Sequence, residues 1–259
     1  MNKDSIVKHW YAYMYEQQVI QADEVNFILS IVGNEPKNIL EVACGGGRIS
    51  VPLAHAGHSV TGFDFDEYML ERIPHKAKGL TNLTYYKSDA VIQDWGKDFD
   101  VVVLAGNILL NIESEMDYRQ AQELFIKKAA NSVKTNGYLY LDFDCYDRSV
   151  QVSVKRNEWV CFEGTDDLDT YGKFIFISGD YNSQTHIDTS YRRFEIYPKY
   201  GEMFSFERTV VKHFPDLAQV KLWLEKAGWN IEYLYGGYER QLVDEKAIGN
   251  RAIIWARKS

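Results

Sequence analysis

The feature that most constrains this chain is a glycine-rich turn between two apolar runs. Residues 38–42 form a short apolar run that carries Glu41, three glycines follow at 45–47, and a second apolar run ends at Asp64. Glycines at such a turn let backbone N–H groups approach a ligand closely, because no Cβ stands in the way. An acid at the tip of the neighbouring strand can accept hydrogen bonds from both hydroxyls of a ribose. The pattern therefore predicts a pocket for a cofactor that contains adenosine.

Two classes of cofactor fit this outline. The dinucleotide fingerprint is G-x-G-x-x-G with an acid about 20 residues later. Gly45 and Gly47 fill its first two places, but Ser50 occupies the third, and the position of Asp64 suits either class. The order acid-x-Ala-Cys-Gly-Gly-Gly, which begins at Glu41, resembles instead the E/D-x-x-x-G-x-G signature of class I S-adenosylmethionine-dependent methyltransferases. In that family the backbone of the loop binds the methionyl end of the cofactor, and the acid of the second strand binds the ribose.

Other motifs of that family follow in order. Residues 66–70 are similar to its D-x-S-x-x-M-L run, in which the methionine, here Met69, lies near the adenine. Ser88-Asp89-Ala90 resembles the step at which a carboxylate meets the adenine amino group. The fourth strand with its initial Phe-Asp pair, the L-x-x-A-G-F helix exit and the reversed last strand match residues 99–105, 224–229 and 251–257.

This resemblance covers residues 38–145 and 215–257 and favours a methyltransferase over an NAD-dependent dehydrogenase. It implies S-adenosyl-L-methionine as the cofactor, and we expect no metal. The residues implied in binding the cofactor are Tyr15, Glu41, Ala43, Cys44, Gly45, Gly47, Asp64, Phe65, Met69, Asp89, Ala90, Leu104 and Gly106.

Strand-like and helical runs alternate along the middle of the chain. This alternation favours a parallel sheet with helices on both faces. With the resemblance, it predicts an α/β fold: a Rossmann-like class I methyltransferase sheet with helices on both faces, plus an inserted antiparallel β-sheet. The expected strands are 38–42, 58–63, 83–87, 99–105 and 137–143, and the expected helices are 23–32, 48–56, 67–72, 117–134 and 217–227.

The insert is expected where the helical period is lost and turn formers separate strand-like runs at 174–177, 190–197 and 203–213. Because an open α/β sheet binds ligands beyond the carboxyl ends of its strands, we expect the insert to cover the pocket. A solvent-exposed appendage or a dimer contact is the alternative. We predict an N-terminal helical lid segment at 1–36, a cofactor-binding core at 37–150, a substrate-covering insert at 151–213 and completion of the core at 214–259.

The composition argues against several classes of function. A net charge of −8 does not suit a surface that follows phosphates, so we expect no nucleic-acid partner. Three cysteines do not make a disulfide framework. The first residues contain no apolar core of signal-peptide length, and no window reaches the roughly 18 apolar residues of a membrane span. We expect a cytoplasmic protein, and the exposed edge strands of the insert leave a homo-oligomer open.

The segment after the fourth strand would lie beside the reactive methyl group. Ala105-Gly106-Asn107 resembles the leucine/glycine-asparagine run found at this place in the glycine and amino-sugar N-methyltransferase group. Asn111 stands where that group usually carries a histidine, which puts a general base at this position in doubt. Asn107 and Asn111 are therefore predicted as catalytic residues that position the acceptor.

The end of the fifth strand, residues 137–147, is similar in spacing to the D-H-R-N-Y-D segment of the same group. Asp144 stands where an arginine would be and Cys145 where an asparagine would be, and those lost residues bind a substrate carboxylate. An acid there favours a cation, so we predict an amine substrate that is not a simple amino acid. Asp144 would orient its amino group, with Tyr146 beside it. The alternative is that Asp144 only caps the following turn.

The aromatic start, residues 10–15, suits a lid over the sulfonium, because aromatic faces attract cations. In the same group, tyrosines of an N-terminal segment close over cofactor and substrate, which implies Tyr15 at the cofactor and Tyr11 at the substrate. The alternative is a helix that packs its apolar side on the domain. His186 and His213 in the insert are further candidates for a base.

The sequence thus predicts a methyltransferase that acts on a small molecule, with N-methylation of an amine by in-line displacement. O-methylation of a hydroxyl, an NAD-binding oxidoreductase and a non-catalytic binding module of the same fold are the alternatives.

Overall fold

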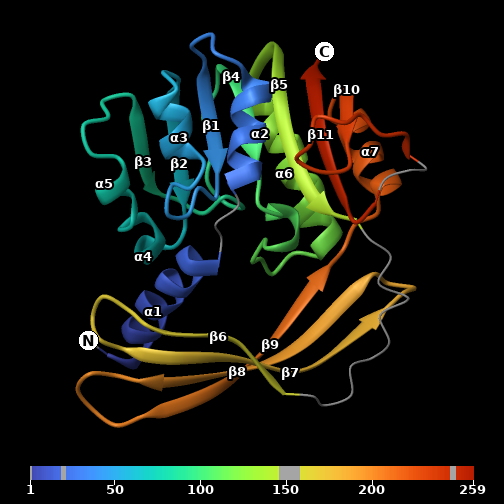
Figure 1. Cartoon of the computed structure of the whole chain (residues 1–259). Coiled ribbons are helices and arrows are strands. Elements are labelled where there is room, and N and C mark those ends of the chain that lie inside the picture. The colour runs from blue at the N-terminus through green and yellow to red at the C-terminus, as the bar shows by residue number, and fades with distance from the viewer. Residues whose placement is uncertain (1, 19–21, 146–157, 246–248) are drawn as a thin grey trace. The chain divides into compact units, whose positions relative to one another are not determined.

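The computed structural model describes residues 2–18, 22–145, 158–245 and 249–259 (Figure 1). The chain divides into two compact units. We call residues 21–146 with 214–259 the core unit, and residues 1–20 with 147–213 the insert unit. The predicted N-terminal segment 1–36 spans both, because its first helix belongs to the insert unit and its second to the core unit.

The core unit is built on a seven-stranded sheet of order β10-β11-β5-β4-β1-β2-β3. The strands from β5 to β3 pair in parallel, whereas β11 and β10 run antiparallel to their neighbours. Chain order reverses between β1 and β4, the place where open α/β sheets bind ligands. The strands are β1 (Asn38–Val42), β2 (Ser59–Asp64), β3 (Leu83–Lys87), β4 (Phe99–Leu104), β5 (Val133–Asp144), β10 (Trp229–Tyr235) and β11 (Arg251–Lys258).

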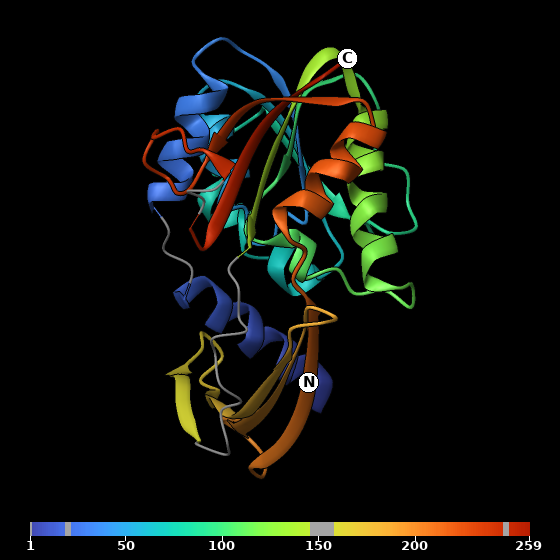
Figure 2. The same cartoon turned by 90° about the vertical axis from the view of Figure 1, so that its right-hand side faces the viewer.

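Helices cover both faces of this sheet (Figure 2). Each face has its own apolar core. On one face, Phe125 of α6 (Tyr118–Ser132) and Trp223 of α7 (Leu217–Lys226) pack on strand residues such as Leu141. On the other, Phe27 of α2 (Ala22–Val32) and Leu53 of α3 (Ser50–His55) pack on strand residues such as Val103. The short elements α4 (Glu67–Leu70), α5 (Ile73–Lys76) and η1 (Ile108–Leu110) complete the unit.

The insert unit is an antiparallel sheet of order β6-β7-β8-β9, with α1 (Lys3–Gln18) packed on it. Trp10 of α1 has no exposed surface, and its indole N–H donates to the carbonyl of Gly164 at 3.0 Å. A Cβ at Gly172 would lie 2.3 Å from the Trp10 ring, so only glycine fits beneath it. The strands are β6 (Trp159–Thr165), β7 (Tyr171–Asn182), β8 (Ile187–Tyr197) and β9 (Phe204–His213).

The predicted fold class is confirmed: the parallel sheet, its reversed end and the separate antiparallel sheet are all present. The differences are local. The predicted helix 67–72 ends earlier, at Leu70 of α4, and α5, which was not predicted, follows at residue 73 with Pro74 in its first turn. Strands β6 and β10 had no predicted range, and Tyr146 lies outside the described residues. In the parts of the chain that the structure describes, no helix has the length and apolar character to cross a membrane.

Candidate functional site

The glycine turn leaves β1 at its carboxyl end in a conformation that favours glycine. Gly45 has φ +52° and Gly47 has φ +76°, both in the left-handed region. A Cβ at Gly47 would lie 3.0 Å from Val51 and 3.1 Å from Ile73, so the turn is also tightly packed. Ala43 takes the same left-handed region with φ 56°. The turn begins α3 at Ser50, two residues later than predicted, because the left-handed residues precede the first helical turn.

Hydrogen bonds connect this turn to the tip of β2. The Gly45 N–H donates to Oδ2 of Asp64 at 2.8 Å, and the Asp66 N–H donates to Oδ1 of Asp64 at 2.9 Å. A carboxylate offers about four lone-pair positions, so these bonds leave acceptor sites for ribose hydroxyls. Burial raises the pKa of the Asp64 carboxyl. The predicted acid and the predicted glycines therefore meet at one place.

Glu41 lies beneath the turn rather than on its surface. Its carboxyl accepts a hydrogen bond from the Ser50 hydroxyl, and only 4% of the residue is exposed. Burial raises its pKa to about 8, against the bonds and charge of Ser50 and Arg48, which lower it. Glu41 thus joins β1 to the first turn of α3. Its predicted contact with the cofactor stays a prediction.

The remaining predicted cofactor residues lie mainly on the loops that follow β2 and β3. The Cε atom of Met69 lies 3.0 Å from the place of a Cβ on Gly45, so Met69 contacts the glycine turn. Phe65 is 55% exposed beside Asp64. After β3, Asp89 accepts the Val91 N–H at 2.7 Å, and the Ala90 carbonyl accepts the indole N–H of Trp95 at 2.8 Å. These bonds fix the loop that follows β3.

Two predicted cofactor residues are buried in the apolar core. The Leu104 side chain has no exposed surface, so only its backbone is available to a ligand. Cys44 is 3% exposed, and burial raises the pKa of its thiol, which keeps the sulfur protonated. Packing, rather than reactivity, accounts for both side chains.

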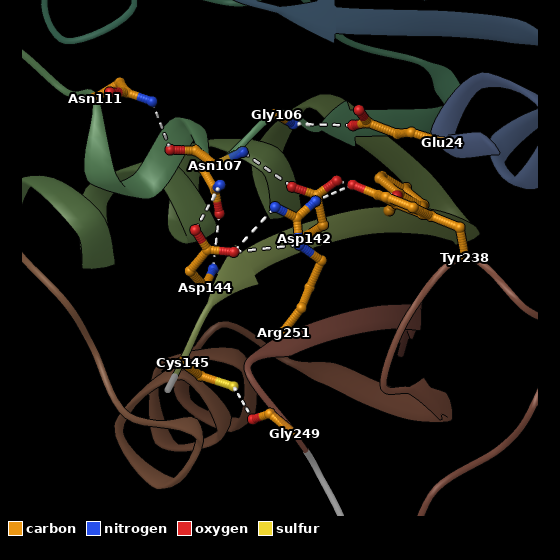
Figure 3. Close-up of polar contacts among 11 residues, drawn as sticks. Glu24, Gly106, Asn107, Asn111, Asp142, Asp144, Cys145, Tyr238, Gly249 and Arg251 are labelled. Atoms are coloured by element: carbon orange, nitrogen blue, oxygen red, sulfur yellow. Dashed lines mark hydrogen bonds and ion pairs between the residues drawn. The ribbon is translucent and has the colours of Figure 1, made fainter. Parts of the chain in front are cut away.

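A second turn, at residues 105–107, follows β4, the strand that pairs with β1. Figure 3 shows the polar contacts of its Gly106 and Asn107. Gly106 has φ +67° and Asn107 has φ +60°. The Asn107 amide exchanges two hydrogen bonds with Asp144: its Nδ2 donates to Oδ2 at 3.1 Å, and its Oδ1 accepts the Asp144 N–H at 2.7 Å. Nδ2 of Asn111 donates to the Asn107 carbonyl at 3.0 Å. The structure therefore brings the three predicted catalytic residues together.

Asp144 is also ion-paired. Nη2 of Arg251, on β11, donates to its Oδ1 at 2.9 Å, and Nε donates to the same oxygen at 3.2 Å. The Arg251 guanidinium also donates to the hydroxyl of Tyr238. The negative charge that was predicted to attract an amine thus has a cation beside it. The role of Asp144 towards an amino group stays a prediction.

Behind the second turn lie two acids without any exposed surface, Glu24 of α2 and Asp142 of β5. Nη1 of Arg48, from the glycine turn, pairs with Glu24 at 2.6 Å, and the Tyr140 hydroxyl donates to Asp142 at 3.1 Å. The sequence analysis did not assign a site role to Glu24, Arg48, Asp142, Tyr238 or Arg251. A signal existed for the two acids, because each lies among apolar residues: Glu24 is one helical turn from Phe27 and Ile28, and Asp142 stands between Leu141 and Phe143.

The other predicted residues belong to the insert unit. The Tyr11 ring packs on Phe194 at 6.1 Å, and Tyr15 is 38% exposed. His186 and His213 stack on each other at 6.4 Å. A group of three possible cation ligands, His9, Asp166 and Asp167, is also found in the insert unit.

Comparison with known proteins supports this arrangement. Residues 39–137 match a family model described as a methyltransferase domain. The chain is 28% identical over 145 residues to a putative methyltransferase, YqeM, of Bacillus subtilis, covering 52% of this chain and 57% of that protein. It is 36% identical over 81 residues to a ubiquinone biosynthesis O-methyltransferase of Pseudomonas fluorescens, covering 30% and 35%. It is 24% identical over 149 residues to glycine N-methyltransferase of Rattus norvegicus, covering 53% and 51%.

Solved structures share the fold over nearly the whole chain. An S-adenosylmethionine-dependent methyltransferase from Clostridium acetobutylicum matches with a TM-score of 0.71 at 18% identity, covering 100% of both chains. The sugar N-methyltransferase KedS8 from a Streptoalloteichus species matches with a TM-score of 0.68 at 15% identity, covering 96% and 92%. At such low sequence identity, these two structures support the fold and not a function. The curated relatives are matched over roughly a third to somewhat more than half of their length.

The predicted cofactor and enzyme class agree with the family match, because residues 39–137 contain the glycine turn, Asp64, Asp89 and the Gly106–Asn107 turn. The resemblance seen in the sequence is therefore confirmed: the chain has the fold of class I S-adenosylmethionine-dependent methyltransferases and carries their methyltransferase domain at residues 39–137.

Proposed function

We propose that the protein transfers the methyl group of S-adenosylmethionine to an amine nitrogen of a small molecule by in-line displacement. The observation that carries this proposal is the hydrogen bond from Gly45 to Asp64, at 2.8 Å. It brings the acid that suits a ribose against the glycine turn that suits the methionyl end. A cofactor bound there would direct its sulfonium towards the turn of β4, the neighbour of β1. There the acceptor would be oriented by Asn107 and Asn111.

A nitrogen acceptor fits the groups around that turn. Orientation alone can supply several kcal/mol to a displacement, and an amine needs little else once it is uncharged. A hydroxyl is a much weaker acid than an ammonium ion, so its methylation calls for a base or a metal close to the methyl group. Side-chain carboxyl and amide groups form the hydrogen bonds of the turn at Gly106 and Asn107. The likeness to a glycine N-methyltransferase points the same way.

O-methylation is the second candidate. The match that favours it is the ubiquinone biosynthesis O-methyltransferase, at 36% identity over 81 residues. If it were correct, acidic hydroxyls such as phenols would be preferred, since these ionise without a strong base.

The insert unit is proposed to cover the acceptor, with Tyr15 and Tyr11 contributed by α1. Because Trp10 anchors α1 in the insert core, deletion of the helix would damage that unit as a whole. The exchange Tyr15→Ala is the cleaner test. It should weaken binding of S-adenosylhomocysteine, and an unchanged affinity would remove Tyr15 from the site.

Two measurements test the proposal in sequence. Calorimetric titration with S-adenosylhomocysteine should give binding, whereas titration with NADH should give none; the reverse would favour an oxidoreductase. Turnover is then screened with labelled S-adenosylmethionine on matched pairs of amines and alcohols of the same carbon skeleton. Product from the amines supports the proposal, and product from the alcohols alone would replace it with O-methylation.

A further inference from the structure

Two buried carboxyl groups bind the backbone of the second turn from behind. The Gly106 N–H donates to Oε1 of Glu24 at 3.2 Å, and the Asn107 N–H donates to Oδ1 of Asp142 at 2.9 Å (Figure 3). Glu24 comes from α2 and Asp142 from β5, so the turn is fixed between a helix and a strand. Neither acid has exposed surface. They cannot touch a bound acceptor, and any effect on it must pass through the turn.

The turn needs such support, because its backbone is strained. Asn107 has φ +60°, in the left-handed region, which a residue with a Cβ occupies at a cost in free energy, although asparagine does so more readily than most. Gly106, with φ +67°, stands directly before it. Two consecutive N–H groups are thus directed to two separate acids. Loss of either acceptor would let Asn107 relax towards an ordinary conformation and move its side-chain amide.

The two acids have different partners. Arg48 forms an ion pair with Glu24, whereas Asp142 accepts a hydrogen bond from the Tyr140 hydroxyl and feels the positive charge of Arg251. Burial, followed by the charge of Glu24, raises the pKa of Asp142 to about 7. Asp142 therefore keeps its proton to a higher pH than an ordinary aspartate does. The other charged or titratable groups of this network are Asp144, Arg251, Tyr238 and Glu41.

We propose that Glu24 and Asp142 are positioning residues for methyl transfer: while one proton lies between them they fix the Gly106–Asn107 turn, and loss of that proton loosens it. The physical reason is that two adjacent buried anions repel each other, and this repulsion displaces the carboxyl oxygens that accept the Gly106 and Asn107 N–H groups. The inference rests on the proposed function, in which this turn orients the acceptor. It adds a pH-dependent control of that orientation from residues that do not touch it.

The key variant is Asp142→Asn. An amide retains an oxygen for the Asn107 N–H and places an N–H where the proton lay, but it does not titrate. Its kcat near pH 6.5 should stay within about threefold of the wild type, because the hydrogen bonds are preserved. The wild-type kcat should fall as the pH rises through about 7, and the variant should lose that fall. Asp142→Ala should lower kcat about 30-fold with an unaltered Kd for S-adenosylhomocysteine, because the acceptor loses its alignment.

Amide hydrogen exchange supplies a readout that does not depend on turnover. Corrected for the intrinsic rate at each pH, exchange of the 104–111 segment should speed up above about pH 7 in the wild type and not in Asp142→Asn. Asp216→Asn, at the N-cap of α7, is the matched control for loss of an acid elsewhere and should behave as the wild type.

The inference is overturned if Asp142→Asn keeps the wild-type pH dependence of exchange. It is also overturned if the corrected exchange rate of residues 104–111 in the wild type does not vary with pH. If no amine is methylated but the exchange result holds, the proposed function fails and the positioning pair stands. If amines are methylated but the exchange rate does not depend on pH, the proposed function stands and the positioning role of Glu24 and Asp142 fails. Melting curves verify that each variant is folded; should Asp142→Ala not fold, the amide variant decides alone.

Discussion

The two turns at the carboxyl edge of the core sheet are built in different ways. The glycine turn after β1 is formed by residues that are close in sequence, with left-handed glycines and a bond to the neighbouring strand tip at Asp64. The turn after β4 is fixed by side chains from far along the chain: Glu24, Asp142 and Asp144 contact it directly, and Arg251 supports Asp144. The first is a backbone device, and the second is a side-chain network.

This difference separates cofactor binding from acceptor positioning. A backbone cradle suits a ligand that is the same in every member of a family, because it depends on main-chain N–H groups and tolerates changes elsewhere. A network of side chains can be altered one residue at a time, which suits an acceptor that varies. Variants of the first turn should therefore change cofactor affinity, and variants of the second should change kcat or acceptor KM.

The largest expected effect tests the cofactor turn. Gly47→Ala should weaken S-adenosylhomocysteine binding about 30-fold or more. The alanine would have to adopt φ +76°, and its Cβ would lie 3.0 Å from Val51. Gly57→Ala is the matched control, since Gly57 has φ +95° but no atom within 4 Å of a Cβ. Both variants place an alanine in a strained left-handed backbone conformation, but only Gly47→Ala brings its Cβ into close contact with neighbouring side chains. Calorimetry should find near wild-type affinity for Gly57→Ala; equal losses in both would show that crowding at the turn is irrelevant.

The next effect tests the side-chain network through a pair of opposite changes. Asp144→Asn leaves Arg251 without its carboxylate, and the resulting positive field should raise the KM of an ammonium-bearing substrate about tenfold. Arg251→Gln leaves Asp144 unpaired, which should keep or lower that KM. Steady-state kinetics at fixed saturating cofactor distinguishes the signs. If both variants raise KM alike, Asp144 only supports the turn, and its predicted role in orienting an amino group is wrong.

A smaller effect concerns the pH dependence of stability. Burial in the folded protein raises the pKa of Glu41 from 4.5 to about 8. The folded state therefore binds this proton more tightly than the unfolded state does. That contribution is fully present below about pH 4.5 and is lost as the pH rises through about 8. Glu41→Gln, which cannot ionise, should melt at a higher temperature relative to the wild type at pH 9 than at pH 5.

Differential scanning fluorimetry across that range checks this expectation. Glu113→Gln, at an exposed position, is the control and should shift the melting temperature equally at every pH. If the difference in melting temperature between Glu41→Gln and the wild type does not vary with pH, Glu41 is already ionised in the folded protein and is stabilised by Ser50 and Arg48.

The same contrast explains what the sequence could predict. The glycine turn, Asp64 and the order of strands follow from local pattern: left-handed glycines, apolar runs and acids at strand tips are visible in adjacent residues. The Arg251–Asp144 pair joins residues 107 positions apart, and the contact of Glu24 with Gly106 joins residues 82 apart. No local rule connects such positions. What local pattern could offer was the anomaly of an acid in an apolar stripe, which marks Glu24 and Asp142 as buried acids without naming their partners.

The smallest expected effect concerns Cys44, which lies in the cofactor turn but contributes through packing. Its sulfur lies 2.9 Å from the place of a Cβ on Gly62, and burial raises the pKa of the thiol. Cys44→Ala should therefore leave the Kd for S-adenosylhomocysteine and kcat within about threefold and lower stability by about 1 kcal/mol, the cost of a small cavity. The native thiol should also resist alkylating reagents in the folded protein, whereas the exposed Cys161 reacts. Rapid alkylation of Cys44, or a large loss of turnover in Cys44→Ala, would contradict a pure packing role and would mean that the cofactor turn, too, depends on a side chain.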